Sequence, residues 1–81
     1  MPTAFVLIKT EIGSSIADVL KDLKKVEGVD EAFAVYGVYD IIARARAESM
    51  DKLREIVAWR IRRVDNVRTT LTMIVVGRQN R

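Results

Sequence analysis

The centre of the chain reads AFAVYGVYDIIARA, residues 32–45. Its two flanks, residues 32–35 and 41–45, are apolar runs that favour strands. The short connection between them contains Gly37 and ends at Asp40, a combination typical of a hairpin turn. We expect Gly37 to adopt a positive φ, and the Asp40 carboxylate to accept hydrogen bonds from the turn amides. This stretch therefore predicts a β-hairpin.

The same turn is a candidate binding site. Residues 36–40 bring a glycine, two tyrosines and a carboxylate together, which no other part of the chain does. Exposed turn amides could hold an anion, and the Asp40 carboxylate could hold a cation. A tight turn needs no ligand to explain it, so composition alone favours the purely structural interpretation.

The residues before the turn predict a strand, a helix and a second strand. Residues 3–9 are apolar on both faces, which is typical of a strand in the middle of a sheet. Ser15 and Asp18 have the spacing of a capping box, and apolar residues then recur at helical intervals. Gly28 is expected to end this helix in the left-handed conformation, and residues 29–36 form the next strand.

The residues after the turn repeat this order. Residues 41–47 alternate as a strand does, and Ser49 is the expected cap of a helix from Met50 to about Arg63. Trp59 lies off the apolar stripe of that helix, as a surface or interface aromatic does. Asn66 is expected to stop the helix before a last strand at residues 69–76. In support of two related halves, KKVEGV at residues 24–29 matches RRVDNV at residues 62–67 type for type.

The order βαββαβ predicts an α+β, ferredoxin-like fold, with an antiparallel sheet and both helices on one face. We expect a single domain at residues 1–77, followed by a basic tail at residues 78–81. Two helices cover only one face of a sheet, yet the strands supply apolar side chains to both faces. These side chains include Phe5, Val6, Leu71, Met73, Ile74 and Val75. Because an open apolar face is stabilised by burial, the pattern predicts an obligate dimer, sheet against sheet.

Composition limits the chemistry that is available. The 81 residues contain no cysteine and no histidine, which excludes zinc sites and catalytic mechanisms that depend on them. No metal or other cofactor is expected. No apolar run approaches the ~20 residues that span a membrane, and no signal peptide precedes the first strand, so a cytoplasmic location is expected. The net charge is only +3, and acidic residues interleave most of the late arginines.

The order of motifs resembles a known family. A helix ends in V-x-G-V, a strand and G-x-x-D follow, and after the next strand a second helix ends in V-x-N-V before a threonine-rich strand. This pattern resembles the effector-binding (RAM) domain of the Lrp/AsnC regulators over essentially the whole chain. Its most specific parts are residues 29–40 and 67–76. Those regulators normally carry a helix-turn-helix segment first, whereas here Met1 and Pro2 lead directly into the first strand, so a stand-alone domain is expected.

The resemblance implies a dimeric α/β barrel formed through the open sheet faces, and further assembly into tetramers or octamers. It also implies that an amino-acid effector binds where dimers meet. The residues expected to line that site are Ala34, Tyr36, Gly37, Val38, Tyr39, Asp40 and Met50, with Thr70, Thr72 and Met73 from the neighbouring subunit. In this interpretation the amides of Gly37 and Val38 take the effector carboxylate, and Asp40 takes its ammonium group.

The sequence thus predicts an amino-acid-binding module that modulates transcription or amino-acid metabolism, and not an enzyme. Full-length regulators of the family are candidate partners, whereas direct DNA binding is not expected. Two alternatives stay open. One is a small barrel enzyme of the isomerase or monooxygenase kind, although Asp40 has no histidine beside it. The other is a nucleic-acid-binding protein that uses Arg44, Arg46 and the late arginines.

Overall fold

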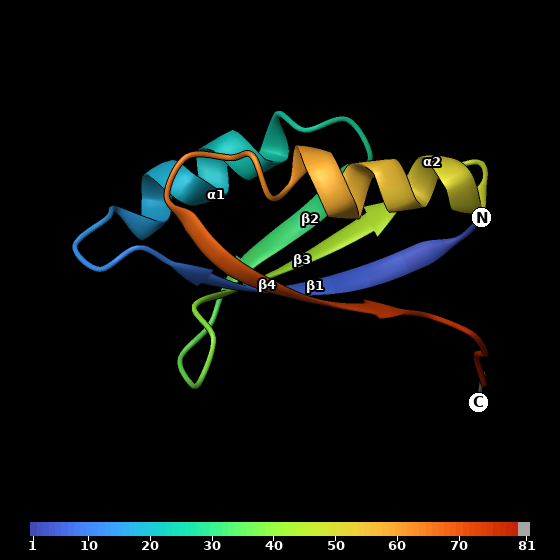
Figure 1. The fold of residues 1–81 in the computed structure, drawn as a ribbon. Coiled ribbons are helices and arrows are strands. Elements are labelled where there is room, and N and C mark those ends of the chain that lie inside the picture. Colours follow the sequence, from blue (N-terminus) through green and yellow to red (C-terminus); the bar gives the residue numbers. More distant parts are fainter. Residues whose placement is uncertain (80–81) are drawn as a thin grey trace.

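A computed structural model describes residues 1–79 of the chain (Figure 1). Its elements are β1 (Thr3–Thr10), α1 (Ile16–Lys24), β2 (Val29–Ala34), β3 (Ile41–Arg46), α2 (Met50–Glu55), the π-helical turn η1 (Ile56–Arg60) and β4 (Val67–Ile74). The strands form one antiparallel sheet in the order β2-β3-β1-β4. Both helices lie on the same side of this sheet. The predicted ferredoxin-like α+β fold is confirmed.

The helix ends follow local capping chemistry. Ser15 Oγ accepts a hydrogen bond from Asp18 N at 3.3 Å, and Ser49 Oγ accepts one from Lys52 N at 3.1 Å. Each bond satisfies a backbone donor that has no partner inside its helix. Gly28 follows α1 with φ +99°, and Asn66 precedes β4 with φ 68°. The two predicted N-caps and both left-handed positions are confirmed, but α1 ends at Lys24 with Lys25 as its C-cap, so Gly28 is not itself the helix cap.

The second helix is less regular than predicted. It is α-helical only to Glu55, and a π-helical turn replaces the α-helix over Ile56–Arg60. The backbone N–H of Ile61 donates to the carbonyl of Ile56 at 2.9 Å, the i→i+5 bond of such a turn. Residues five apart therefore share a face, so Ile56 and Ile61 are both buried while Trp59 is 65% exposed.

The strand boundaries also shift. β2 ends at Ala34 and not at residue 36, and β4 covers Val67–Ile74 where residues 69–76 were predicted. The reason lies in pairing, because β4 follows its partner β1. Thr10 faces Val67, and Ala4 faces Ile74 across the two strands. Hydrogen bonding to β1 thus sets the first and last residues of β4, and the composition of the segment alone does not predict them.

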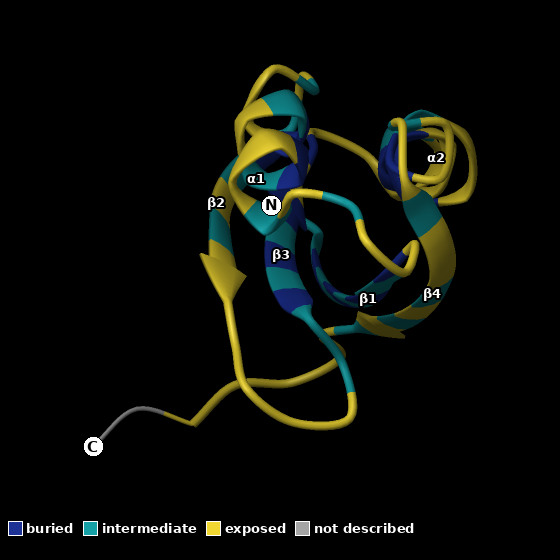
Figure 2. Cartoon of the chain, turned by 90° about the vertical axis from the view of Figure 1, so that its left-hand side faces the viewer, coloured by how far each residue is buried: buried dark blue, intermediate teal, exposed yellow. Residues whose placement is uncertain are grey.

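The sheet has one covered and one open face (Figure 2). Along β1 the buried residues Ala4, Val6 and Ile8 alternate with the partly exposed Phe5 and Leu7. This alternation follows from the two-residue period of a strand, with the buried set facing the helices. The prediction of apolar side chains on both faces is confirmed.

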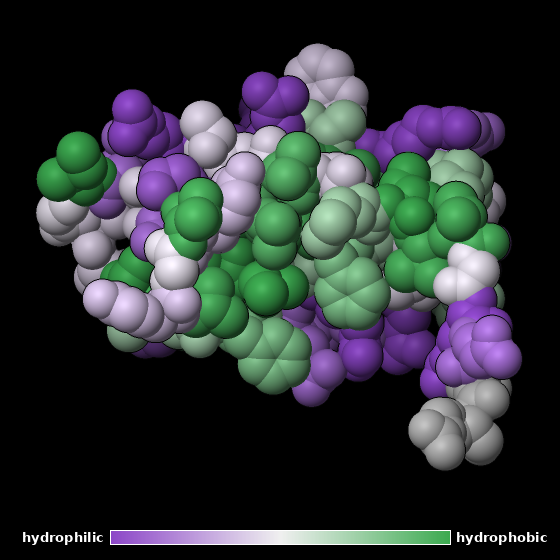
Figure 3. Space-filling model, turned by 90° about the horizontal axis from the view of Figure 1, so that it is seen from below, coloured by the Kyte–Doolittle hydropathy of each residue, from purple (hydrophilic) through white to green (hydrophobic). Residues whose placement is uncertain are grey.

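Hydrophobic side chains gather across the middle of the open face (Figure 3). The exposed ones are Phe33, Leu71, Met73 and Val75, which are 50%, 47%, 48% and 39% exposed. Register places Leu71 beside Leu7 and Met73 beside Phe5, so β1 and β4 form a continuous apolar strip. Large apolar patches of this kind mark interaction surfaces.

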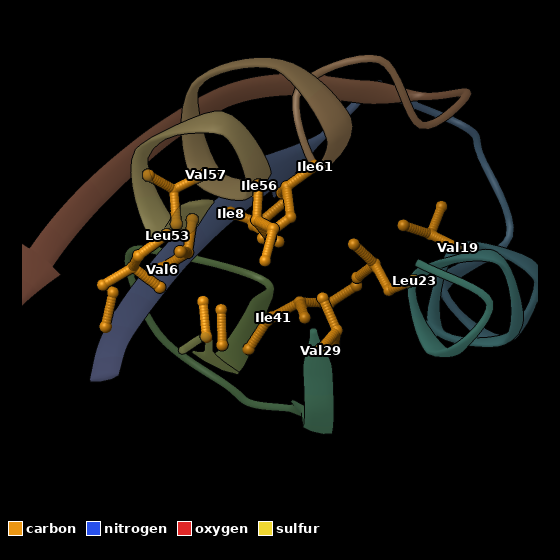
Figure 4. Close-up of a cluster of buried hydrophobic side chains, with 14 residues drawn as sticks. Val6, Ile8, Val19, Leu23, Val29, Ile41, Leu53, Ile56, Val57 and Ile61 are labelled. Atoms are coloured by element: carbon orange, nitrogen blue, oxygen red, sulfur yellow. The ribbon is translucent and has the colours of Figure 1, made fainter. Parts of the chain in front are cut away.

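The core lies between the covered face and the two helices (Figure 4). Val19 and Leu23 reach it from α1, and Leu53, Ile56, Val57 and Ile61 reach it from α2 and the residues after it. Small side chains of β3, Ala43 and Ala45, lie beneath them. The alanines of β3 let the helices approach this strand closely while every core position stays apolar.

Candidate functional site

The connection between β2 and β3 is a loop of residues 35–40, longer than the predicted turn. The backbone N–H of Val35 donates to the carbonyl of Asp40 at 2.9 Å and closes the base of the loop. The loop projects beyond the sheet on the side away from the helices (Figures 1 and 2). Tyr36 is fully exposed and Val38 is 77% exposed, so the loop tip presents its side chains to the surroundings.

Strand β1 holds this loop in place. Lys9 Nζ donates to the Val38 carbonyl at 2.9 Å, and the Asp40 N–H donates to the Ile8 carbonyl at 2.9 Å. Asp40 Oδ2 accepts two more hydrogen bonds, from Thr10 N at 2.9 Å and from Thr10 Oγ1 at 3.1 Å. The prediction that Asp40 would bond to the turn amides is therefore wrong, because the end of β1 supplies nearer donors.

Lys9 and Thr10 contact the loop although neither was predicted as a site residue. The signal that could have found them is the change from apolar to polar residues at the end of the first strand. Lys9 bonds to the tip of the loop and Thr10 bonds to its base. These contacts hold the loop in one conformation. Such pre-organisation lowers the entropic cost of binding a ligand.

Asp40 is an ionised carboxylate at neutral pH. The hydrogen bond from the Thr10 backbone N–H lowers the pKa of Asp40, and this exceeds the opposing effect of desolvation. The Thr10 hydroxyl and the positive charge of Lys9 act in the same direction as the backbone bond. Both hydrogen bonds from Thr10 end on Oδ2, which leaves Oδ1 for another donor.

Gly37 does not have the backbone conformation predicted for it. Within residues 1–79 the glycines with positive φ are Gly13 and Gly28. A loop of this length spreads the reversal of the chain over several residues, so Gly37 need not be left-handed. A Cβ atom added at Gly37 would meet nothing within 4 Å. The glycine thus leaves open space at the loop tip.

The other predicted site residues lie in three places. Ala34 ends β2 beside the loop, whereas Met50 begins α2 at the far end of β3 (Figure 1). Thr70 and Thr72 pair with Ile8 and Val6, whose side chains face the helices. Met73 pairs with Phe5 and shares its open face. One chain therefore does not bring Met50 or these three β4 residues to the loop tip, and their role in a neighbouring subunit stays a prediction.

A cluster of charges occupies the open face beside the apolar strip. Asp30 Oδ1 lies 2.9 Å from Arg44 Nε, and Asp30 Oδ2 lies 2.6 Å from Arg46 Nε. Glu31 Oε1 adds a contact of 2.8 Å to Arg44 Nη2. Desolvation raises the pKa of Asp30, but the hydrogen bonds from Arg44 and Arg46 outweigh it and lower the pKa. These two arginines are thus paired with acids and do not form a free phosphate-binding patch.

Over residues 1–79, no three acidic side chains cluster closely enough to hold a metal ion. Neither helix described here has the length and hydrophobicity needed to cross a membrane.

Taken together, the covered face of the sheet, its open face and the anchored loop define a small ferredoxin-like α+β domain. The Lrp/AsnC ligand binding domain matches residues 3–80, and the chain belongs to that family.

Relatives with known sequences or structures agree with this assignment. An uncharacterised HTH-type transcriptional regulator of Pyrococcus furiosus is 34% identical over 74 residues, which cover 89% of this chain and 49% of the regulator. The chain thus spans about half the length of the curated relatives that it matches. A hypothetical protein of Pyrococcus horikoshii is 32% identical with a TM-score of 0.84, over 96% of this chain and 93% of that one.

A third relative was solved with a bound amino acid. It is the feast or famine regulatory protein of Mycobacterium tuberculosis, complexed with L-methionine. It is 27% identical to this chain with a TM-score of 0.78, and the match covers all of this chain and 54% of that protein. Both the predicted family and the predicted fold are therefore confirmed.

Proposed function

We propose that this domain binds a free amino acid and acts as the effector-sensing part of an Lrp/AsnC-type regulatory system. The observation that carries this proposal is the loop of residues 35–40, which β1 holds outside the sheet with an ionised carboxylate at its base. Membership of a ligand-binding family and the L-methionine complex of the M. tuberculosis relative support it.

The chemistry of the loop suits a small zwitterion. An amino acid carries an anion and a cation a few Å apart, so its receptor needs a donor and an acceptor at similar spacing. In this proposal Asp40 accepts the ammonium group, and donors near the loop hold the carboxylate. Ala34, Tyr36, Gly37, Val38 and Tyr39 surround the loop tip. From other parts of the assembly, Met50, Thr70, Thr72 and Met73 complete the pocket.

The proposal includes a homodimer formed through the open face. Phe33, Leu71, Met73 and Val75 are exposed there as one apolar region, which favours burial against a second copy. Dimers would then join into tetramers or octamers, with the loops at their contacts. An effector held at such a contact shifts the assembly equilibrium by the difference in its affinity for the two states. Co-assembly with full-length regulators would carry this signal to DNA.

A thermal-shift screen of the twenty L-amino acids, with L-methionine included, tests the proposal. We expect a subset to raise the melting temperature, because a ligand that binds only the folded state stabilises it. Asp40→Ala removes the ammonium acceptor and Gly37→Trp fills the open space at the loop tip, so both should abolish the rise.

The matched control is Glu27→Ala, which removes an exposed carboxylate beside Gly28, at the end of β3 opposite the loop. Light scattering should give the same mass for all variants and the parent. Equal thermal responses in parent, Asp40→Ala and Gly37→Trp would contradict the proposed site. The absence of any response in the parent would contradict amino-acid binding itself.

A further inference from the structure

A polar hollow of about 390 Å³ lies where β1 ends, between the base of the loop, the β1–α1 connection and β4. We name it the sheet-end hollow. Its charged and polar lining comprises Lys9, Thr10, Glu11, Ser14, Asp40 and Arg68. Its volume falls within the range of about 300–1,000 Å³ that is usual for small-molecule sites.

Asp40 lines this hollow, and Thr10 fixes the position of its carboxylate. Both hydrogen bonds from Thr10 end on Oδ2, and within residues 1–79 no hydrogen bond reaches Oδ1. The lowered pKa keeps the group ionised. The hollow therefore contains a fixed negative charge with one oxygen available to a ligand.

Arg68 supplies the opposite charge. Arg44, Arg46, Arg54 and Arg60 all form ion pairs. Arg68, which lines the hollow, forms none with any acid in the described chain, as is also true of the exposed Arg62 and Arg63, which do not line it. This holds although Asp40 and Glu11 line the same hollow. Lys9, the other cation there, already donates to the Val38 carbonyl. Arg68 is thus the cation whose donors remain unused.

Two opposite charges that line one hollow without touching leave room for a molecule that bridges them. We propose that the sheet-end hollow holds the α-amino and α-carboxylate groups of the amino acid. The carboxylate lies against the Arg68 guanidinium, and the ammonium lies against Asp40 Oδ1. A guanidinium suits the first contact because its fork of N–H donors matches a carboxylate in two parallel hydrogen bonds.

This inference rests on the proposed function, and it changes where the ligand is held. The carboxylate contacts Arg68 at the base of the loop rather than the amides of Gly37 and Val38 at its tip. The loop tip then contacts only the side chain of the amino acid. Arg68 becomes the residue that distinguishes an amino acid from an amine.

Isothermal titration with the amino acid that gives the largest thermal shift tests this assignment. Arg68→Met should weaken binding by about tenfold or more, since a charged hydrogen-bonding partner is lost. Arg68→Lys should weaken it less, because the charge remains but the fork is lost. Arg62→Met removes another exposed arginine that forms no ion pair within residues 1–79, and this variant should bind as the parent does.

The ligand can be changed as well as the protein. The methyl ester of the same amino acid lacks the carboxylate charge, so the parent should bind it more weakly than the free acid. Arg68→Met should bind the ester and the free acid with similar affinity, because the group that distinguishes them is gone. This comparison within the parent remains informative if Arg68→Met does not fold.

The failure of this inference differs from the failure of the proposed function. Should Arg68→Met bind as the parent does while Gly37→Trp abolishes binding, the sheet-end hollow is not the site and the loop tip is. An ester that the parent binds as tightly as the free acid would also overturn the Arg68 contact. If the parent binds none of the twenty amino acids, both proposals are wrong.

Discussion

Asp40 accepts two hydrogen bonds from Thr10, one from its backbone N–H at 2.9 Å and one from its hydroxyl at 3.1 Å. The two residues lie thirty positions apart and join the loop between β2 and β3 to the end of β1. This contact decides how the candidate site is built. It orients the carboxylate, leaves one oxygen for a ligand and ties the loop to the middle of the sheet.

The Asp40–Thr10 contact predicts a dependence of stability on acid pH. The pKa of Asp40 is lowered from its ordinary value of 3.8, so the folded state favours the ionised form. The stabilisation is therefore complete above the pKa of the unfolded chain, and it is lost as the pH falls through the lower pKa of the folded state.

Asp40→Asn, which keeps an acceptor but has no charge to titrate, measures this effect. Urea denaturation from about pH 7 to about pH 2 should show that the difference in free energy of unfolding between parent and variant shrinks below about pH 4. A difference that stays constant over this range would mean that Asp40 does not titrate with a shifted pKa.

Two glycines should respond in opposite ways to the same substitution. Gly28 has φ +99°, and an added Cβ would overlap Ile56 Cδ1 and lie 3.2 Å from the Arg46 carbonyl oxygen. We expect Gly28→Ala to lower the free energy of unfolding by about 1–3 kcal/mol. Gly37→Ala, which meets open space, should change it by less than about 0.5 kcal/mol or raise it slightly. Chemical denaturation of both variants checks this contrast, and equal losses would contradict the loop geometry described above.

The cap of α2 should contribute measurably to stability. Ser49 Oγ accepts the hydrogen bond of Lys52 N, which otherwise has no partner inside the helix. Ser49→Ala should therefore cost about 1 kcal/mol in urea denaturation. Ser49→Asp keeps an acceptor at the cap and serves as the control. A loss of equal size in both variants would indicate that the side chain matters for another reason.

The open face should control assembly. Leu71 is 47% exposed beside Leu7 on this face, and Leu71→Glu would place a charge where a second copy buries apolar surface. We expect sedimentation velocity to show a lower mass or an unfolded chain for this variant. Ala58→Glu, on the exposed surface of η1, should keep the mass of the parent. If Leu71→Glu also keeps that mass, the open face does not form the dimer contact.

Much of the fold could be predicted because it depends on local chemistry. The alternation of Val6 and Ile8 with Phe5 and Leu7 gives a strand with two apolar faces whatever its neighbours are. Ser15, Ser49, Gly28 and Asn66 act on residues within a few positions of themselves, so their roles follow from spacing.

The irregular parts were not predictable in the same way. The π-helical turn after Glu55 places both Ile56 and Ile61 in the core, so it accompanies tertiary packing and has no local signal in the sequence. The positive φ predicted for Gly37 was wrong because the loop begins at residue 35, where β2 stops pairing. Each of these features depends on packing or register between elements.

The sequence by itself determined the order βαββαβ, the N-caps of the helices and the place of Gly37 and Asp40 in the connection between β2 and β3. Only the tertiary structure decided that Asp40 bonds to Thr10 and that Arg68 lines the same hollow as Asp40. The physical reason is register: β1 meets β3 on one side and β4 on the other, so residues from distant parts of the chain meet at one end of the sheet. The spacing of residues within one strand does not say which residues of a neighbouring strand lie opposite them.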